Sequence, residues 1–227
     1  RGGLDSDIVP TPVFGQGLNI APSFGVNIAL SESVMLGLGL GYTARGAFYQ
    51  INVPALFIRY KPCDVATGNI SLGYRGDAFS IRAMASYSVE QTTTVANPSG
   101  TFPDFRAGDR IVLGLRSAYT FNDQWAASVN VDYTHMNKNK YPQFVPPPTV
   151  MLPETFNSNS SMIRVTTGVT YTGANYSISP SVTFLYRDRN GYDPTTAQFL
   201  PAKTTWTAGL SGAYDLGNGV RLNGSVS

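Results

Sequence analysis

Arginine is the residue type in this chain whose spacing points most directly to chemistry. Seven arginines occupy alternate positions in runs whose intervening residues are apolar: Arg75, Arg82, Arg110, Arg116, Arg164, Arg187 and Arg221. The acids that share this alternation are fewer: Glu90, Asp132 and Asp215. A guanidinium grips a carboxylate or phosphate with two parallel hydrogen bonds. If these ten residues line a pore, the excess of arginine favours anions; the alternative is that arginines and acids pair and fill the interior.

The sequence offers little else for catalysis. His135 lies at the outward end of a predicted strand, and Asn137 stands where a nucleophilic serine would be needed two residues later. Cys63 is the only cysteine, so an internal disulfide is excluded, and with a single histidine no metal cluster can form. We therefore predict no enzyme activity, no cofactor and no metal.

The elements that must position these side chains are β-strands. In the run Val34–Tyr42, one set of alternate residues is apolar and ends in an aromatic ring, whereas the other set is mainly glycine. A period of two is typical of a strand, because successive side chains point to opposite faces of a sheet. The glycines Gly37, Gly39 and Gly41 leave space on the polar face, which side chains from elsewhere or a loop could occupy. The alternative is that they ease the curvature of the strand at a bend of the barrel.

The same alternation recurs ten times. The predicted strands are 17–30, 34–45, 65–75, 78–90, 109–121, 125–138, 161–172, 176–189, 204–216 and 219–227. Short links that suit tight turns alternate with long ones at about 46–64, 91–108, 139–160 and 190–203. Transmembrane barrels have this asymmetry, with short periplasmic turns and longer extracellular loops. The sequence therefore predicts an all-β, antiparallel transmembrane β-barrel in a bacterial outer membrane.

Aromatic residues at the strand ends support lipid contact, because amphipathic rings favour the headgroup level. The predicted periplasmic rim consists of Tyr74, Phe79, Tyr119, Phe121, Trp125, Tyr171, Tyr176 and Tyr214. The predicted outer rim consists of Tyr42, Tyr87, Tyr133, Tyr186 and Trp206. The rival reading is a soluble β-sandwich, whose exposed face would normally carry Lys and Glu. Here the polar face carries Gly, Ser, Thr, Asn and Arg instead.

The composition of the chain excludes one class of binding partner. Only 13% of residues are charged and the net charge is +2, which argues against nucleic acid as a partner. Expected partners are outer-membrane lipids and small-molecule solutes, with a homo-oligomer or an envelope complex as a further prediction. No composition shift divides the chain, so residues 1–227 are one predicted domain. Strand parity at both ends predicts a missing strand at each, and hence a barrel of twelve or more strands.

These patterns resemble the Gram-negative outer-membrane β-barrel superfamily of porins and substrate-specific channels, most clearly at 36–43 and 119–127. The resemblance implies a channel, and our first hypothesis is passive diffusion of small hydrophilic solutes, with a mild preference for anions. One alternative is a structural or secretion barrel. Another is a channel for apolar compounds, which the apolar loops 48–58 and 144–153 would suit. Those loops could narrow the mouth, contact a partner, or in part extend the third strand above the membrane.

Overall fold

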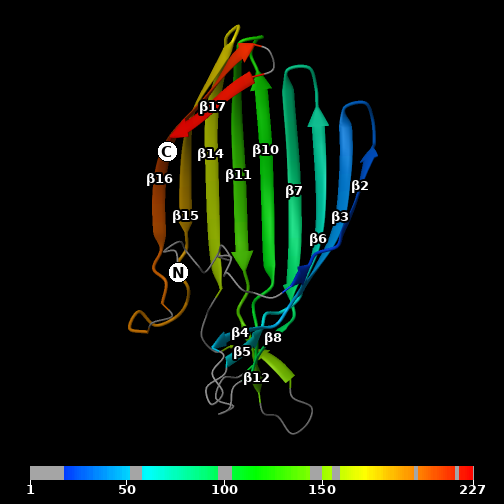
Figure 1. The fold of residues 1–227 in the computed structure, drawn as a ribbon, viewed down its shortest axis with the longest axis vertical. Coiled ribbons are helices and arrows are strands. Elements are labelled where there is room, and N and C mark those ends of the chain that lie inside the picture. The colour runs from blue at the N-terminus through cyan, green and yellow to red at the C-terminus, as the bar shows by residue number, and fades with distance from the viewer. Residues whose placement is uncertain are drawn as a thin grey trace.

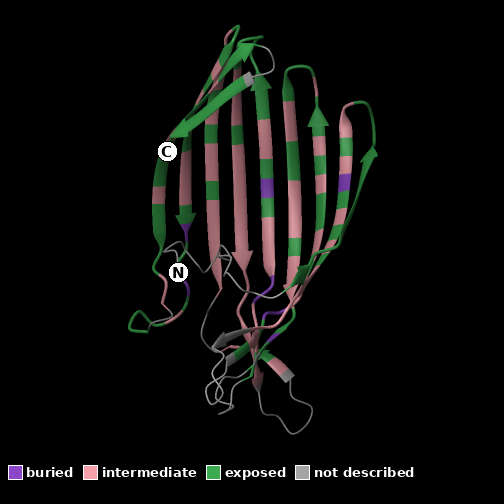
Figure 2. Cartoon of the chain, viewed as in Figure 1, coloured by how far each residue is buried: buried purple, intermediate pink, exposed green. Residues whose placement is uncertain are grey.

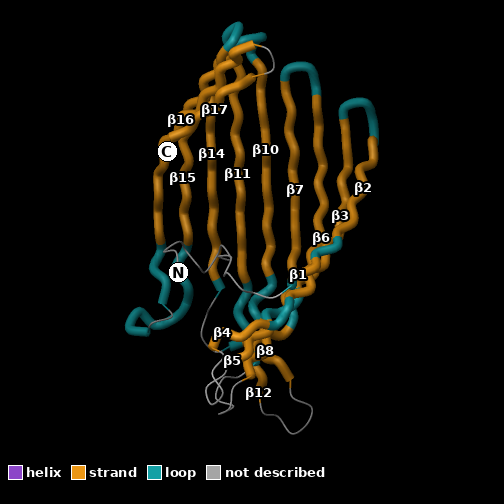
Figure 3. The backbone as a smooth tube through the Cα atoms, viewed as in Figure 1, coloured by secondary structure: helices purple, strands orange, loops and turns teal. Residues whose placement is uncertain are grey.

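The computed structural model describes residues 18–51, 58–96, 104–143, 150–154, 159–196, 199–217 and 220–226. These segments form strands, turns and loops (Figure 3). None of the described residues belongs to a helix long and apolar enough to span a membrane. Two antiparallel sheets account for every described strand; the larger extends along most of the long axis, and the smaller lies at its lower end (Figure 1).

The larger sheet, here called the wall, contains the strands that the alternation predicts. They are β1 (Asn19–Ile20), β2 (Ser23–Ala29), β3 (Val34–Arg45), β6 (Val65–Arg75), β7 (Phe79–Glu90), β10 (Arg110–Thr120), β11 (Trp125–Met136), β14 (Ser160–Thr172), β15 (Tyr176–Arg187), β16 (Lys203–Gly217) and β17 (Val220–Val226). Each strand from β3 onward pairs antiparallel with the next wall strand in the chain, and both β1 and β2 pair with β3. The predicted all-β antiparallel class is confirmed.

The strand register aligns the apolar residues across the wall. Leu36 lies opposite Leu72, Leu72 opposite Ala83, and Ala83 opposite Leu115. Among the described residues no second layer covers this face, so large apolar side chains such as Leu40 remain exposed, at 68%. Figure 2 shows that few residues anywhere in the wall are buried. A single-layer sheet with an uncovered apolar face is what a lipid-facing barrel wall requires.

The short turns form as expected. The Ser31 hydroxyl accepts hydrogen bonds from the backbone N–H groups of Ser33 and Val34. Asn122 Oδ1 does the same for Gln124 and Trp125. These are the side-chain caps that hold a tight turn. At the last turn Gly217 adopts a φ of 78°, a conformation that glycine reaches without strain.

The long connections differ from the expectation that they are mainly loops. Their strands are β4 (Phe48–Ile51), β5 (Ile58–Lys61), β8 (Thr92–Ala96), β9 (Phe105–Arg106), β12 (Lys140–Gln143) and β13 (Val150–Pro153). They form the second sheet, in the order β13-β12-β9-β8-β5-β4. The first loop therefore does not extend the third predicted strand: β4 and β5 belong to the second sheet, and residues 62–64 separate β5 from β6. The strands of the loops at 91–108 and 139–160 belong to the second sheet as well. The remaining parts of the two apolar loops lie outside the described residues.

The first predicted strand, 17–30, is interrupted. It divides into β1 and β2 around Ala21 and Pro22, because proline has no N–H to donate to the ladder. The Pro22 carbonyl still accepts a hydrogen bond of 3.0 Å from the Tyr42 N–H, so β3 stays continuous across the break. Within the described residues the wall is open, with β1 and β2 at one edge and β17 at the other. A closed barrel of twelve or more strands stays a prediction.

The uncovered apolar face generates the first test. Leu115→Arg places a charge on that face, and we expect it to lower the free energy of unfolding in lipid vesicles by about 2–4 kcal/mol if the residue lies near the bilayer midplane. The matched control is Val112→Arg, three residues away on the opposite face, between Ser86 and Thr134. Guanidinium unfolding followed by heat-modifiable gel mobility measures both. Equal losses in the two variants would contradict a lipid-facing surface.

Candidate functional site

The register places all ten predicted pore-lining residues on one face of the wall, here called the polar face. Arg82 lies opposite Arg116, Asp132 opposite Arg164, and Arg221 opposite Asp215. The remaining members share the same alternation along their strands: Arg75, Arg110, Arg187 and Glu90. Their role as the lining of a pore stays a prediction, but their common orientation follows from the pairing.

The arginines of the polar face differ in whether an acidic side chain pairs with them. Arg116 forms an ion pair of 2.5 Å with Asp132 and also donates to the Val131 carbonyl at 3.2 Å. Arg82 donates to the neutral Ser71 hydroxyl at 2.9 Å. Contact of either arginine with Glu90 is not observed; Glu90 instead accepts a hydrogen bond from the Cys63 thiol. Pairing with acids thus explains Arg116 but not Arg82.

The other arginines have varied surroundings. Arg187 is only 4% exposed and donates to the Pro201 carbonyl at 3.1 Å, so it holds the connection between β15 and β16. The Nε of Arg110 is buried and makes no hydrogen bond within the described residues. Arg221 is exposed at the edge of the wall.

The glycines of β3 accommodate side chains of the polar face, as expected. A Cβ on Gly39 would lie 2.5 Å from Asn69 Oδ1, and a Cβ on Gly37 would lie 2.6 Å from the Ser71 hydroxyl. The Asn69 amide and the Ser71 hydroxyl of β6 therefore lie over the glycines of β3. Nothing occupies the corresponding space at Gly41.

Predicted girdle residues lie at the ends of the apolar face, and several touch one another. Near the short turns, ring centroids are 4.9 Å apart for Trp125 and Tyr171, and 5.8 Å apart for Tyr171 and Tyr176. Tyr119 and Phe121 form an edge-to-face pair at 5.0 Å. Most other members are exposed: Tyr42, Tyr74, Phe79, Tyr87, Tyr186, Trp206 and Tyr214. Such a belt is typical of the headgroup region.

At the opposite rim the tyrosines make bonds that the sequence reading missed. The Tyr42 hydroxyl donates to Asp64 at 2.8 Å, and the Tyr87 hydroxyl donates to Asp109 at 3.1 Å. Each aspartate stands one residue before the wall strand that follows, so a tyrosine near the end of one strand ties down the start of the next. The backbone N–H of Arg45, and then Tyr42, lower the pKa of Asp64. The recurring Asp before a strand was the signal available in the sequence.

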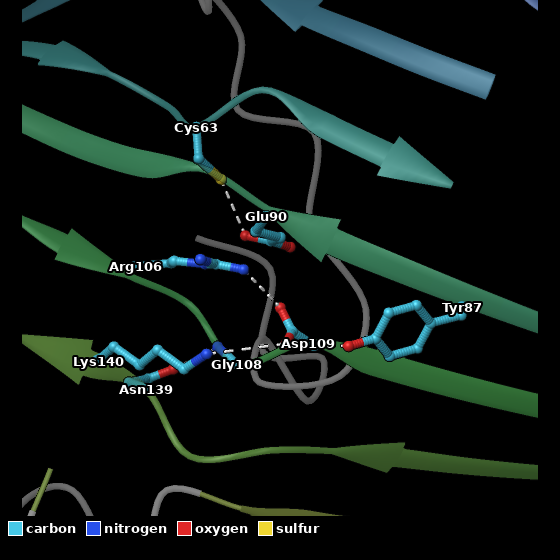
Figure 4. A network of polar contacts seen from close by, with 8 residues as sticks. All are labelled: Cys63, Tyr87, Glu90, Arg106, Gly108, Asp109, Asn139 and Lys140. Atoms are coloured by element: carbon cyan, nitrogen blue, oxygen red, sulfur yellow. Dashed lines mark hydrogen bonds and ion pairs between the residues drawn. The ribbon is translucent and has the colours of Figure 1, made fainter. Parts of the chain in front are cut away.

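A buried polar cluster lies where the wall meets the second sheet, and we call it the junction (Figure 4). Asp109 is 9% exposed and contacts Arg106 at 3.1 Å and Lys140 at 3.8 Å. Gly108 donates to Asn139 Oδ1 at 3.1 Å. A Cβ there would lie 1.8 Å from the Asn137 carbonyl oxygen, so only glycine fits.

Cys63 belongs to the same junction and is 3% exposed. Its backbone N–H donates to the Thr93 hydroxyl at 3.1 Å, and its thiol donates to Glu90 at 2.9 Å. Burial, reinforced by the Glu90 carboxylate, raises the pKa of the Cys63 thiol to about 11. A protonated, covered thiol is a poor nucleophile and a poor metal ligand, so its surroundings make Cys63 unreactive in the folded protein.

His135 has a serine neighbour that sequence spacing did not reveal. Its Nδ1 lies 2.9 Å from the hydroxyl of Ser161, the residue directly opposite on β14, and Tyr133 lies 3.3 Å from the same hydroxyl. Within the described residues no carboxylate hydrogen-bonds to the imidazole to orient it as a base. The pair therefore works as a cross-strand tie, like the Tyr–Asp bonds of the same rim.

The second sheet carries aromatic pairs beyond the junction. Phe48 on β4 and Tyr60 on β5 pack edge to face with ring centroids 5.5 Å apart. Phe105 on β9 and Tyr141 on β12 lie 6.3 Å apart. These four half-buried rings come from three successive long connections, so the end of the molecule opposite the short turns presents aromatic surface.

Comparison with solved structures finds a transporter and channels of low sequence identity to this chain. The toluene transporter TodX of Pseudomonas putida is 12% identical, with a TM-score of 0.45 over 90% of this chain and 62% of that one. The CymD monoaromatic hydrocarbon channel is 14% identical, with a TM-score of 0.45 over 91% and 67%. A deltaS2 mutant of TodX is 13% identical, with a TM-score of 0.48 over 91% and 63%. The chain spans about two thirds of their length or slightly less.

No protein-family model matches the chain, and no curated protein matches it by sequence. The class of the fold therefore rests on the wall itself. An antiparallel sheet with an apolar, aromatic-belted face is typical of bacterial outer-membrane barrels.

The junction generates a prediction about thiol reactivity. With a pKa of about 11, less than about one in a hundred Cys63 thiols is ionised at pH 8, so we expect very slow alkylation by iodoacetamide in the folded protein. Unfolding in guanidinium exposes the thiol and should make labelling fast, as mass spectrometry can follow. Glu90→Gln removes the neighbouring negative charge, lowers the pKa and should speed labelling of the folded form. Equal rates for folded and unfolded protein would contradict the buried site.

A second prediction concerns Asp109, which joins the wall to the second sheet. Asp109→Ala removes its bonds to Tyr87, Arg106 and Lys140, and we expect faster proteolysis in the long connections while the heat-modifiable wall persists. Asp123→Ala, in an exposed short turn, is the matched control. Limited proteolysis with mass mapping measures the effect. If both variants are cut equally fast, Asp109 does not secure the second sheet.

Proposed function

We propose that this chain forms part of the wall of an outer-membrane channel through which apolar compounds, above all aromatic ones, diffuse passively. The observation that carries the proposal is the single-layer wall, with an apolar face aligned across its strands and a polar face on the other side. Such a wall separates lipid from an aqueous or solute-filled lumen. Lipids of the outer membrane would cover the apolar face.

The choice of solute depends on the end of the molecule that the long connections form. In a barrel of this type that end faces the exterior, so its rings are the first surface that a solute meets. The Phe48–Tyr60 and Phe105–Tyr141 pairs offer stacking and edge contacts to an aromatic compound. Apolar solutes were the second alternative from the sequence. They agree better than hydrophilic ones with the toluene and monoaromatic hydrocarbons named for TodX and CymD.

Small hydrophilic solutes are the second candidate, because the polar face offers hydroxyls, amides and guanidinium groups. Pairs such as Thr67 with Ser88, at 3.0 Å, and Thr166 with Thr183, at 3.0 Å, show how densely hydroxyls line it. A secretion or structural role, and assembly into a homo-oligomer or an envelope complex, stay predictions.

Uptake of labelled toluene into Gram-negative cells that produce the complete protein tests the proposal. We expect uptake several-fold faster than in cells without the protein, and no increase in arabinose-driven swelling of vesicles that contain it. Phe105→Ala should reduce toluene uptake about two- to tenfold, the worth of one aromatic contact. Phe121→Ala, at the opposite rim, is the matched control.

The alternatives give different results. Arabinose swelling without a gain in toluene uptake would favour the hydrophilic candidate. If neither solute passes and planar bilayers show no conductance, the channel proposal is wrong.

A further inference from the structure

Two arginines stand directly opposite each other on the polar face without an acid between them. Arg82 on β7 is the cross-strand partner of Arg116 on β10. Like charges in that position destabilise a pair of strands. The two guanidinium groups have turned apart, Arg82 toward Ser71 on β6 and Arg116 toward Asp132 on β11. The repulsion between these two charges therefore destabilises the pairing of β7 and β10 at this position.

The two arginines share one cavity. Its volume is about 630 Å³, and Arg75 also lines it, with Ser80, Ser128 and Asn130 supplying neutral polar groups. Glu32, in the turn between β2 and β3, is the one carboxylate among the lining residues. Asp132 offsets the charge of Arg116 from outside the lining. Positive charge therefore exceeds negative charge around this space.

Arg82 is the member best placed to bind an anion. Its side chain is exposed, and among the described residues no carboxylate pairs with it. It extends over two glycine positions: a Cβ on Gly73 would lie 3.9 Å from its Cγ, and one on Gly37 would lie 3.9 Å from its Nη2. Both distances are ordinary van der Waals contacts, so the two glycines leave space beside the Arg82 side chain. The strands beneath thus leave it free to present its fork of N–H donors.

We propose that Arg82 and Arg116 form an oxyanion-binding site on the polar face, which receives the carboxylate of an organic solute in transit. This deepens, and rests on, the proposed channel for apolar and aromatic compounds: its substrates would include those that combine an apolar body with one carboxylate. An oxyanion between the two guanidinium groups relieves their repulsion and accepts bidentate hydrogen bonds from Arg82. The Asn130 amide and the Ser71 hydroxyl are neighbouring groups that can complete its coordination.

Phosphate offers the same oxyanion chemistry, so the test uses two probes. Isothermal titration calorimetry of the complete protein in detergent measures binding of benzoate and of inorganic phosphate, with uncharged benzamide as the comparison. We expect benzoate to bind and benzamide to bind at least tenfold more weakly, because one charged hydrogen-bonded contact carries that difference. Phosphate binding without benzoate binding would overturn the solute assignment.

Variants locate the site. Arg82→Gln should weaken benzoate binding about tenfold or more, and Arg82→Lys should weaken it less, because lysine retains the charge but lacks the planar fork. Arg221→Gln is the matched control, since Arg221 lies on the same face at the edge of the wall, opposite Asp215. Heat-modifiable mobility confirms that each variant is folded.

The outcomes separate this proposal from the channel itself. If toluene uptake is intact but Arg82→Gln and Arg221→Gln bind benzoate like the unaltered protein, the oxyanion site is wrong and the channel stands. If benzoate binding depends on Arg82 while neither toluene nor benzoate enters cells, the site exists but the transit role is wrong.

Discussion

The structure depends on one constraint: in a bilayer, each backbone N–H and C=O must find a partner within the protein. The wall meets it by pairing each strand from β3 onward with the next wall strand, joined by short turns at one end. This pairing fixes the register, and the register then determines which side chains share a face. The lipid-facing band, the aromatic belts and the row of arginines are all consequences of that single ladder.

Once the register is fixed, the two faces differ in where they place polar and charged groups. The apolar face carries hydroxyls at Ser117 and Thr167, and at its rim Tyr87 and Asp109 can reach the headgroup region and each other. The polar face must accommodate guanidinium groups in a row, and it does so with one strong ion pair, at Arg116 and Asp132, and with glycines that make room. The repulsion left between Arg82 and Arg116 is therefore local, and it is compatible with the stability of the wall as a whole.

Local alternation explains why most of the wall could be predicted from sequence. Strands such as β3 and β6 match their predicted limits because each residue of a two-faced strand carries the signal. The second sheet was missed because its strands are four or five residues long at most, and they are specified by pairing between separate connections. The Tyr–Asp ties and the contact of His135 with Ser161 were missed for the same reason: they join residues more than twenty positions apart. The face of the wall on which each arginine lies follows from the alternation alone. The residues that each arginine contacts can be identified only from the folded structure.

The second sheet repeats the strand order of the wall, since β4, β5, β8, β9, β12 and β13 follow one another as their parent strands do. The two sheets are separate ladders that meet at the junction. Insertions or substitutions at the tips of these hairpins therefore leave the strand pairing within the membrane unchanged. Natural selection by phages, antibodies or new solutes can act on the exterior of such a protein without altering its anchoring. We expect related sequences to diverge most beyond the junction and to preserve the alternation, though not the individual residues, within the wall.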